Sequence, residues 1–478
     1  MTRTYYLVLD LGTSSSKAFI FRDDRTLCFS HRVKHGLNRP APHHVEADAV
    51  AILSAVRELI DHADQWAADQ HVDIQSAGIA CQRSTFLFWD KTDGHPLGPA
   101  LSWQDSRAGD LVREMEVFSQ RIHEKTGIPL SAHFGGPKYR YLLDHDPELA
   151  AAVEADSAWF GPLSAFVVHQ LSGVAAVDES IAGRSLLFHL DRREWDPDLL
   201  QGFGVRPSAL PPLKPALSDW GRLPLNSGSV PLRCVIGDQQ AALIGQGGGH
   251  PGTLAMNFGT SGSVQFNTGS RPRHIPGLLS NVLVSGPGDI QYLLEGTINA
   301  CNSLFYWLEE RLHIPHREMI WDRRAESVTV NGALVPGFVG LAAPYWKAQF
   351  ETVYYGLTKS DPDQLVRAAM ESIGLLVQDI LMTMDEPLPP GPVSVSGGGS
   401  RPPLLQFLAD LLRHPVGHSA MKDRTALGVL RLLSDTDITE TETADFDAVY
   451  TPGKGAAWRR KKRETWRAAL KAAGIEAV

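Results

Sequence analysis

The chain has 478 residues, of which 43% are hydrophobic, and its 45 lysines and arginines against 54 aspartates and glutamates give a net charge of −9. At about 150 residues per domain, this length predicts two or three domains and excludes a small scaffold held together by disulfides or metals. The acidic excess leaves no general basic face for nucleic acid, and no apolar run is long enough to span a membrane.

The first predicted elements are a strand at 5–10, a polar turn at 11–17 and a second strand at 18–21, which together form a β-hairpin. Asp10 stands where a signal peptide would continue its apolar segment. No CxxC pair occurs among the four cysteines, which are Cys28, Cys81, Cys234 and Cys301. These features predict a cytoplasmic protein with reduced thiols and no zinc knuckle.

Two histidines after the hairpin, His31 and His35, have the i,i+4 spacing that places metal ligands on one face of a helix. Residues 28–35, however, have the pattern of an extended strand, in which the two rings would lie about 13 Å apart. We therefore expect surface histidines rather than a metal site formed by this pair.

The next segments alternate between the two kinds of secondary structure. The pattern predicts a helix at 48–67, a strand at 74–80, strands at 85–90 and 97–103 around a turn, and a helix at 106–125 with Gly127 just past its end. Strands that alternate with helices indicate an α/β architecture.

The segment between Asp238 and Arg271 contains no charged residue but is rich in glycine, amides and hydroxyls. Such a segment suits backbone packed around a ligand, because glycine permits close approach and the polar groups can donate hydrogen bonds. It also repeats the hairpin turn, since Gly-Thr-Ser-x-Ser occurs at 12–16 and again at 259–263, each time between two strands. The repeat predicts two halves of one plan around a central cleft.

The second half contains a further pattern that is typical of a ligand-binding site. A helix is predicted from Asp361-Pro362 to Met384, followed by a strand at 392–396, the turn Gly397–Gly399 and a helix at 403–412. A glycine turn before a helix N-terminus suits phosphate or ribose oxygens. The basic run 459–463 is expected to be a solvated helix face rather than a nucleic-acid patch.

Several common enzyme motifs are absent from the sequence. It contains no GxxxxGK[ST], no GxSxG and no GxGxxG after a strand. These absences argue against a P-loop enzyme, a serine hydrolase and a dinucleotide-dependent dehydrogenase.

Taken together, the motifs resemble the FGGY carbohydrate kinases, a family of ATP-dependent sugar and polyol kinases, and among them the glycerol kinases most. The resemblance covers nearly the whole chain. It rests on residues 9–17 (LDLGTSSSK), 81–83 (CQR), 102–107 (SWQDSR), 236–243 (IGDQQAAL), 257–262 (NFGTSG), 340–346 (GLAAPYW) and 396–399 (SGGG). It implies two ribonuclease H-like domains of the actin and heat-shock type, which we place at 1–246 and 247–478, facing a cleft where ATP and sugar meet.

The resemblance also implies roles for individual residues. Asp238 resembles the general base that takes the proton of the attacking hydroxyl, and Asp10 resembles the carboxylate that holds Mg²⁺. The implied nucleotide-binding residues are Gly12, Thr13, Ser14, Ser15, Lys17, Gly259, Thr260, Gly398 and Gly399. The implied substrate-binding residues are Arg83, Ser84, Trp103, His133, Asp238 and Gln239. Without the family pattern, Asp10 and the two threonines could merely cap turns, and Trp103 could be a core residue.

The sequence departs from the family pattern at ligand-facing positions. Ser84 stands where glycerol kinases have glutamate, His133 where they have tyrosine, and Ser263 where they have an aromatic residue. These replacements predict a roomier, less anionic pocket than one made for glycerol. Lys347 and Glu351 replace the usual Asp and Arg, which puts family-type regulation and subunit contacts in doubt, and a homodimer is left open.

The leading hypothesis is therefore an enzyme that uses ATP and Mg²⁺ to phosphorylate a terminal hydroxyl of a small polyol or sugar. The alternatives are a glycerol kinase proper, a non-catalytic sugar or nucleotide sensor with the same fold, and a heat-shock-type ATPase. Retention of Asp238 argues against the sensor. The heat-shock alternative would need an added peptide-binding domain, for which only about 80 residues remain after the last glycine motif.

Overall fold

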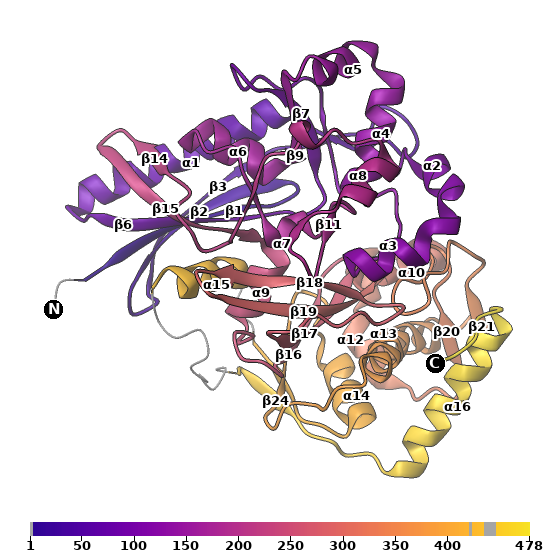
Figure 1. Ribbon diagram of the computed structural model, residues 1–478. Coiled ribbons are helices and arrows are strands. Elements are labelled where there is room, and N and C mark those ends of the chain that lie inside the picture. The colour runs from indigo at the N-terminus through magenta and orange to yellow at the C-terminus, as the bar shows by residue number, and fades with distance from the viewer. Residues whose placement is uncertain (1–2, 420–422, 435–445) are drawn as a thin grey trace.

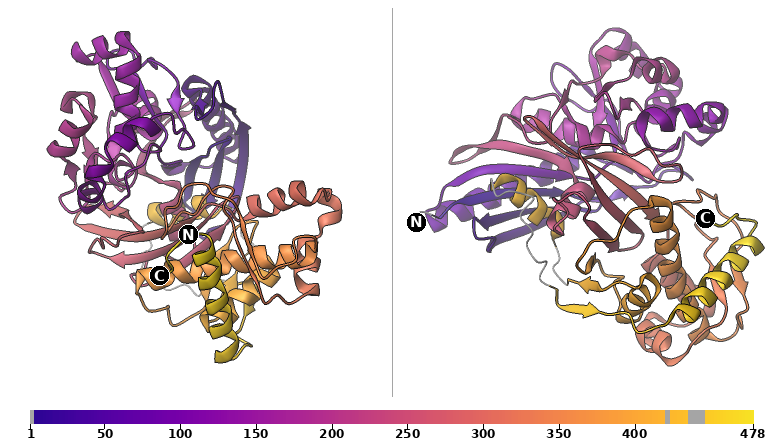
Figure 2. Two further views of the ribbon diagram at one scale, coloured as in Figure 1. Left: turned by 90° about the vertical axis from the view of Figure 1, so that its right-hand side faces the viewer. Right: turned by 60° about the horizontal axis from the view of Figure 1, so that its bottom comes forward.

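The structure is a computed structural model that describes residues 3–419, 423–434 and 446–478. Figure 1 shows the indigo and violet N-terminal half above the orange and yellow C-terminal half, and Figure 2 shows the same two bodies from two other sides. Each half is organised around a mixed β-sheet with its own buried apolar core. The predicted α/β class with two facing domains is thus confirmed.

The N-terminal sheet contains the predicted hairpin at its centre. Its strand order is β14 (Arg222–Leu225), β15 (Gly228–Gly237), β6 (Ile74–Cys81), β1 (Tyr5–Leu11), β2 (Ser15–Arg22) and β3 (Leu27–Lys34). Strands β6 and β15 run parallel to β1, whereas β2 and β3 continue the sheet in antiparallel fashion.

The C-terminal sheet repeats this arrangement. Its strand order is β18 (Leu279–Gly286), β19 (Asp289–Ile298), β17 (Gly262–Gly269), β16 (Leu254–Phe258), β22 (Val393–Ser396), β23 (Val416–His418) and β24 (Ala448–Tyr450). Strands β16, β22 and β23 are parallel, and β17 and β19 are antiparallel neighbours of β16 and β17. The repeated Gly-Thr-Ser turns therefore join equivalent hairpins, β1–β2 and β16–β17, as the sequence repeat predicted.

Capping residues explain where the long helices begin. Asp48 accepts hydrogen bonds from two amides at the start of α1 (Ala49–Gln70), and Asp361 does the same for α13 (Pro362–Met384), whose first residue is proline. Helix α1 buries one apolar face, so the amphipathic helix predicted at 48–67 is confirmed. The long helix predicted at 361–384 is also confirmed, but α13 is buried on all sides along residues 368–377. The glycine turn leads from β22 into α14 (Pro402–Leu412), also as predicted.

The helix predicted at 106–125 is wrong as a single element. The segment forms α2 (Gly109–Glu114), a 3₁₀ turn η1 (Glu116–Phe118) and α3 (Ser119–Thr126), and only the end at Gly127, with φ +74°, is confirmed. Helix α2 buries no side chain, whereas α3 buries Ile122 and Thr126. No continuous apolar face spans the segment, so nothing holds its parts in one straight helix.

The N-terminal half carries an additional lobe with its own aromatic core. Its sheet has the order β4 (Leu37–Asn38), β5 (Glu46–Ala47), β8 (Ala100–Leu101), β7 (Phe86–Asp90) and β9 (Ala158–Pro162), so the strand predicted at 97–103 is reduced to two residues. The lobe and its surroundings contain α4 (Gly135–His145), α5 (Pro147–Glu154), α6 (Leu163–Ser172), α7 (Glu179–Ala182), α8 (Pro197–Phe203) and η2 (Pro207–Ala209). Short strand pairs complete it, namely β10 (Val177–Asp178) with β13 (Leu213–Lys214) and β11 (Phe188–His189) with β12 (Glu194–Trp195).

The rest of the C-terminal half covers its sheet with helices and one strand pair. These elements are α10 (Asn302–Leu312), α11 (His316–Met319), α12 (Trp321–Ser327), β20 (Ala333–Val335), β21 (Val353–Tyr355) and α16 (Ala456–Ala472). Helix α16 carries the basic run 459–463. Lys461 is exposed as predicted, but the prediction is wrong for Lys462, which is buried and donates to Glu371 and to the carbonyl of Val330.

Two helices join the halves. Helix α9 (Asp238–Gly245) follows β15, helix α15 (Arg424–Leu433) comes after β23 at the equivalent place, and the two pack directly on each other. Their backbones meet at glycines, because a methyl group on Gly428 would lie 1.8 Å from the Ala241 carbonyl oxygen and one on Gly245 would lie 2.0 Å from that of Arg424. Among the described residues, no helix has both the length and the apolar character needed to cross a membrane.

Candidate active site

The first Gly-Thr-Ser turn lies at the end of β1. Within it, the backbone amide of Gly12 donates to the carbonyl of Ser15 over 3.2 Å, and the side-chain amide of Gln82 donates to the carbonyl of Gly12 over 3.1 Å. The indole of Trp103 donates to Thr13 Oγ1 over 2.9 Å. Residues from three segments therefore fix a short polar turn beside Asp10.

Asp238 is the first residue of α9, directly after the end of β15. Its Oδ1 accepts from the Gln239 amide over 2.7 Å and lies 3.8 Å from Arg83 Nε. Burial raises the pKa of Asp238, while Arg83 opposes that rise. Burial, and next the charge of Asp238, raise the pKa of Asp10 from 3.8 to about 7. The ends of β1 and β15 thus place two electrostatically coupled carboxyl groups in one region.

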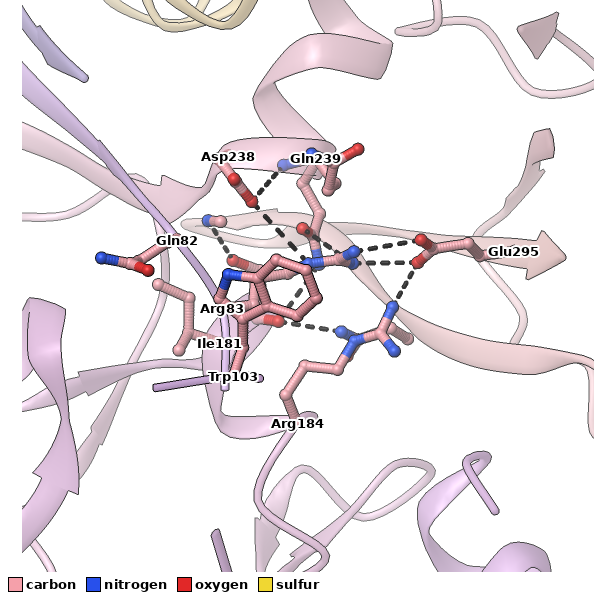
Figure 3. Close-up of polar contacts among 12 residues, drawn as sticks. Gln82, Arg83, Trp103, Ile181, Arg184, Asp238, Gln239 and Glu295 are labelled. Carbon is pink, nitrogen blue, oxygen red and sulfur yellow. Dashed lines mark hydrogen bonds and ion pairs between the residues drawn. The ribbon is translucent and has the colours of Figure 1, made fainter. Parts of the chain in front are cut away.

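Arg83 is held by a buried carboxylate from the other half of the chain. Its two terminal nitrogens lie 2.9 and 3.0 Å from the oxygens of Glu295 on β19, and Arg184 pairs with the same carboxylate. Figure 3 shows both guanidinium groups converging on Glu295, with Asp238 on the other side of Arg83. Although burial opposes ionisation, the two arginines hold the pKa of Glu295 at about 2.

The face of β17 next to this cluster includes Ser263. In the register of β17 and β19, Gln265 stands opposite Glu295 and Ser263 opposite Thr297, so Ser263 lies one step along the same face. The side-chain amide of Gln265 donates to the carbonyl of Gln239 over 3.4 Å. The structure thereby brings Gln239 and Ser263 to the neighbourhood of Arg83.

Ser84 has a backbone conformation that is unusual for a serine. It is buried with φ +62°, and its carbonyl accepts from Lys138 Nζ over 2.7 Å. The same nitrogen donates to the carbonyl of Ser102 over 2.7 Å. Lys138 is fully buried on α4, and burial lowers its pKa to about 7. One lysine therefore ties together the two loops that carry Arg83 and Trp103.

Trp103 and His133 lie together at the open side of these loops. The side chain of Trp103 is 42% exposed, so it is not a core residue. The exposed His133 places Nδ1 3.0 Å from the Trp103 carbonyl oxygen. Both residues are thus available to a ligand above the turn that holds Thr13.

The second Gly-Thr-Ser turn, between β16 and β17, is held by the start of α10. The carbonyl of Gly259 accepts from the Asn302 amide over 3.0 Å, and the carbonyl of Thr260 accepts from the amide of Cys301 and the hydroxyl of Ser303. The carbonyls of Gly259 and Thr260 therefore face the start of α10. The turn is built as the counterpart of Gly12–Ser15.

The glycine turn after β22 lies beside the same helix start. The amide of Gly399 donates to the Phe258 carbonyl over 2.6 Å, and a methyl group on Gly398 would meet nothing closer than Asn302 Nδ2 at 3.8 Å. Asn302 Oδ1 is buried and accepts no hydrogen bond from any residue that the structure describes. Open space over Gly398 and an unsatisfied acceptor beside it form a cradle for a ligand with a hydrogen-bond donor.

Lys17 lies opposite Asp10 in the β1–β2 hairpin but points to the other half of the chain. Its Nζ pairs with Asp423 over 2.6 Å. Asp423 is the N-cap residue of α15, and Gly237 is the N-cap residue of the equivalent helix α9 in the first half. The predicted phosphate-binding lysine therefore joins the two halves across the cleft in this structure.

Sequence reasoning missed Glu295, Arg184 and Lys138. None of them lies in a glycine-rich or repeated motif, and Glu295 is 212 residues away from Arg83. A signal was nevertheless available for Glu295 and Arg184, because each is a charged residue inside an otherwise apolar segment, where burial requires a partner.

Comparisons with known proteins match this architecture. The profile of the FGGY family of carbohydrate kinases, N-terminal domain, matches residues 5–245, and that of the C-terminal domain matches residues 254–434. A glycerol kinase of Limosilactobacillus reuteri is 31% identical over 438 residues, covering 89% of this chain and 88% of the relative.

Solved structures show the same fold over nearly the whole chain. Glycerol kinase of Plasmodium falciparum with ADP superimposes with a TM-score of 0.88 at 25% identity, covering 98% of both chains. Gluconate kinase of Lactobacillus acidophilus superimposes with a TM-score of 0.87 at 21% identity, covering 98% of this chain and 99% of the other. With two matched domain profiles and a relative above 30% identity, the chain belongs to the FGGY family of carbohydrate kinases.

Proposed function

We propose that this carbohydrate kinase transfers the γ-phosphoryl group of ATP to a terminal hydroxyl of a small polyol or sugar with four or more carbons, with Asp238 as the general base. The observation that carries the proposal is the coupled pair of carboxyl groups at the ends of β15 and β1. Phosphoryl transfer needs a base for the nucleophile, a metal and oriented donors, and little covalent chemistry from the protein.

Asp238 is suited to accept the hydroxyl proton. Burial raises its pKa, which makes the carboxylate a better base than an exposed aspartate. Arg83, 3.8 Å away, keeps the ionised form accessible. Proton transfer to Asp238 increases the nucleophilicity of the substrate oxygen, which attacks the γ-phosphorus as the bond to the ADP oxygen breaks.

The site also fits a magnesium ion near Asp10. Burial and the negative charge of Asp238 make ionisation of Asp10 costly, and a divalent cation would remove that cost. Asp10 would hold the ion through its carboxylate, and the ion would supply positive charge to the phosphate oxygens. The backbone amides and hydroxyls of Gly12–Ser15 and of Gly259–Thr260 would donate to the same phosphates.

The nucleoside part of ATP fits the cradle formed by the glycine turn. Gly398 leaves space for a flat group against the backbone, and the unsatisfied Asn302 Oδ1 would accept a hydrogen bond from a ribose or base donor. Gly399 is pinned to Phe258, so the turn is already shaped before a ligand arrives.

The acceptor pocket supports a substrate longer than glycerol. Ser84 and Ser263 are small residues, and the Ser84 carbonyl is occupied by Lys138, so neither offers a second carboxylate nor an aromatic wall. Apart from the proposed base Asp238, the carboxylate beside Arg83 is that of Glu295, and two arginines already neutralise it. Two small hydroxyl-bearing side chains in place of a carboxylate and an aromatic ring favour an acceptor with additional hydroxyl-bearing carbons.

A coupled ADP-release assay with a panel of acceptors tests the proposal. We expect kcat/KM to be higher for erythritol, xylulose or ribulose than for glycerol by about ten-fold or more, since each lost substrate hydrogen bond costs about 0.5–1.5 kcal/mol. A ten-fold preference for glycerol would establish the glycerol kinase alternative. No ADP release with any acceptor would establish the sensor alternative, and release that ignores the acceptor would establish an ATPase.

A further inference from the structure

A second cluster of side chains that could bind a metal lies between the edge strand β3 of the N-terminal sheet and helix α1. It consists of His31 on β3 and of Glu58 and His62 on α1. One ligand atom from each residue lies within 4.8 Å of the others, and the imidazole centroids of His31 and His62 are 4.2 Å apart. The side chains of Glu58 and His62 are 53% and 51% exposed, so solvent reaches the cluster.

A neighbouring aromatic contact between α1 and β3 explains why the three side chains lie close together. The Trp66 ring lies 6.0 Å from that of Phe29 and 6.3 Å from that of Tyr5, which positions α1 on the sheet. Moving back one i,i+4 step on the helix advances about 6 Å, and moving two residues along a strand advances about 6.7 Å. The two steps, from Trp66 back to His62 and from Phe29 on to His31, are nearly equal in length. His62 therefore contacts His31 when Trp66 contacts Phe29.

The same periodicity adds the third group. Glu58 precedes His62 by four residues and therefore lies on the same helix face, with its Oε1 4.0 Å from His62 Nε2. The extended strand expected at 28–35, in which the rings of His31 and His35 would lie far apart, is confirmed by β3. His35 instead hydrogen bonds Ser16 over 3.0 Å, and His31 finds its partners on a different element.

We propose that His31, Glu58 and His62 form a surface site for a borderline transition-metal cation of the Zn²⁺ class. Two imidazoles and one carboxylate are a common set of protein ligands for Zn²⁺, Co²⁺ and Ni²⁺, and they leave coordination positions open to water. Mg²⁺ prefers oxygen ligands and is a poor match for two imidazoles. The site is therefore chemically distinct from the metal position that we assign to Asp10.

Closure of the site requires only side-chain movement. Ligand atoms around one zinc ion lie about 3.4 Å apart in a tetrahedron, which follows from metal–ligand distances near 2.0–2.1 Å. The present separations of up to 4.8 Å exceed that value by at most about 1.4 Å, and two of the three side chains are half exposed and can rotate. A bound ion would link helix α1 to the edge strand β3 and so stabilise the N-terminal sheet.

Titration of the full chain with Zn²⁺ tests the site directly. The protein should carry no histidine tag, should be stripped of metal with a chelator, and should be kept in excess Mg²⁺ so that the Asp10 region is occupied. We expect saturable binding of one Zn²⁺ per chain by calorimetry, and an absorption band in the visible range when Co²⁺ replaces Zn²⁺. Zn²⁺ should also raise the thermal midpoint of the protein.

Ligand variants and a matched control decide the outcome. His31→Ala, His62→Ala and Glu58→Gln should each weaken Zn²⁺ affinity by more than about ten-fold, because even loss of a group that only orients a ligand costs that much. His95→Ala, which removes an exposed histidine elsewhere, should leave it unchanged. Absence of saturable binding to the wild type, or equal affinity in wild type and all three variants, would overturn the proposal. Because Glu58 is exposed, its variant folds even if a histidine variant does not.

Discussion

Among single residues, Asp10 shows most clearly how this cleft departs from ordinary solution chemistry. It lies at the end of a buried strand, and burial together with the charge of Asp238 raises its pKa from 3.8 to about 7. The unfolded chain releases this proton near pH 4, whereas the folded chain keeps it until about pH 7. The folded state therefore loses stability relative to the unfolded state as the pH rises through that window.

Replacement of Asp10 by asparagine should remove this pH dependence. The stability of Asp10→Asn relative to wild type should increase by about 1–3 kcal/mol between pH 4 and pH 8, measured by urea unfolding without Mg²⁺ or nucleotide. Asp23→Asn, at an exposed position, serves as the control and should give a constant difference. A constant difference for Asp10→Asn as well would contradict the assigned coupling.

Glu295 is the opposite case, a buried carboxylate kept ionised by Arg83 and Arg184. Glu295→Gln would leave two buried guanidinium groups without a counter-charge, so we expect a loss of about 3–5 kcal/mol in the free energy of unfolding. Asp110→Asn breaks an exposed pair with Arg113 and should cost no more than about 1 kcal/mol. Similar small losses in both variants would show that Arg83 does not depend on Glu295.

At the scale of elements, α4 holds the two loops that carry Arg83 and Trp103 through one side chain. Lys138 donates to the carbonyl of Ser84, which follows Arg83, and to the carbonyl of Ser102, which precedes Trp103. Lys138→Met keeps the length of the side chain but leaves both carbonyls unsatisfied. It should raise KM for the acceptor by about ten-fold or more while KM for ATP stays within about two-fold.

The control for this variant is Lys471→Met, which changes an exposed lysine on α16. It should leave both Michaelis constants unchanged. If Lys138→Met raised the two constants equally, or lowered stability without changing either, Lys138 would be a general core residue rather than a positioning residue for the acceptor site.

The elements that could be predicted from sequence are those with local causes. The two Gly-Thr-Ser hairpins, the helix capped by Asp361 and the glycine turn at 397–399 each depend on neighbouring residues, and all are present. The segment 106–125 was predicted wrongly because its apolar residues do not share one surface, a property that only tertiary packing reveals.

The candidate site divides in the same way. Asp10, Asp238 and the turns around Thr13 and Thr260 belong to repeated or glycine-rich motifs, so the sequence alone indicated them, and their roles stay predictions. The Arg83–Glu295 pair joins the loop after β6 to the interior of β19, 212 residues away, and no local pattern encodes that contact. Lys138 was missed because its partners are backbone carbonyls, which leave no trace in the amino-acid sequence.

For the whole molecule, the crossing of α9 and α15 connects the two halves next to the proposed base. A methyl group on Gly428 would lie 1.8 Å from the Ala241 carbonyl oxygen, so Gly428→Ala must displace one helix from the other. We expect a loss of about 1–3 kcal/mol in the free energy of unfolding and a lower kcat, because α9 begins at Asp238.

Gly202→Ala is the matched control, since Gly202 lies in α8 and a methyl group there would meet no atom within 4 Å. Alanine favours helix, so this variant should be as stable as the wild type or slightly more so. Thermal unfolding and steady-state kinetics of the two variants provide the comparison. Equal behaviour of Gly428→Ala and Gly202→Ala would mean that the helices do not pack as described.

The role proposed for Asp238, the base in acceptor-dependent phosphoryl transfer, is tested by comparing Asp238→Asn with wild type in the ADP-release assay at saturating ATP and acceptor. We predict that kcat falls by about 10²–10⁴-fold, the usual contribution of general-base catalysis, while the dissociation constant for ATP, measured by calorimetry, stays nearly unchanged. Wild-type turnover in the Asp238→Asn variant would contradict the account.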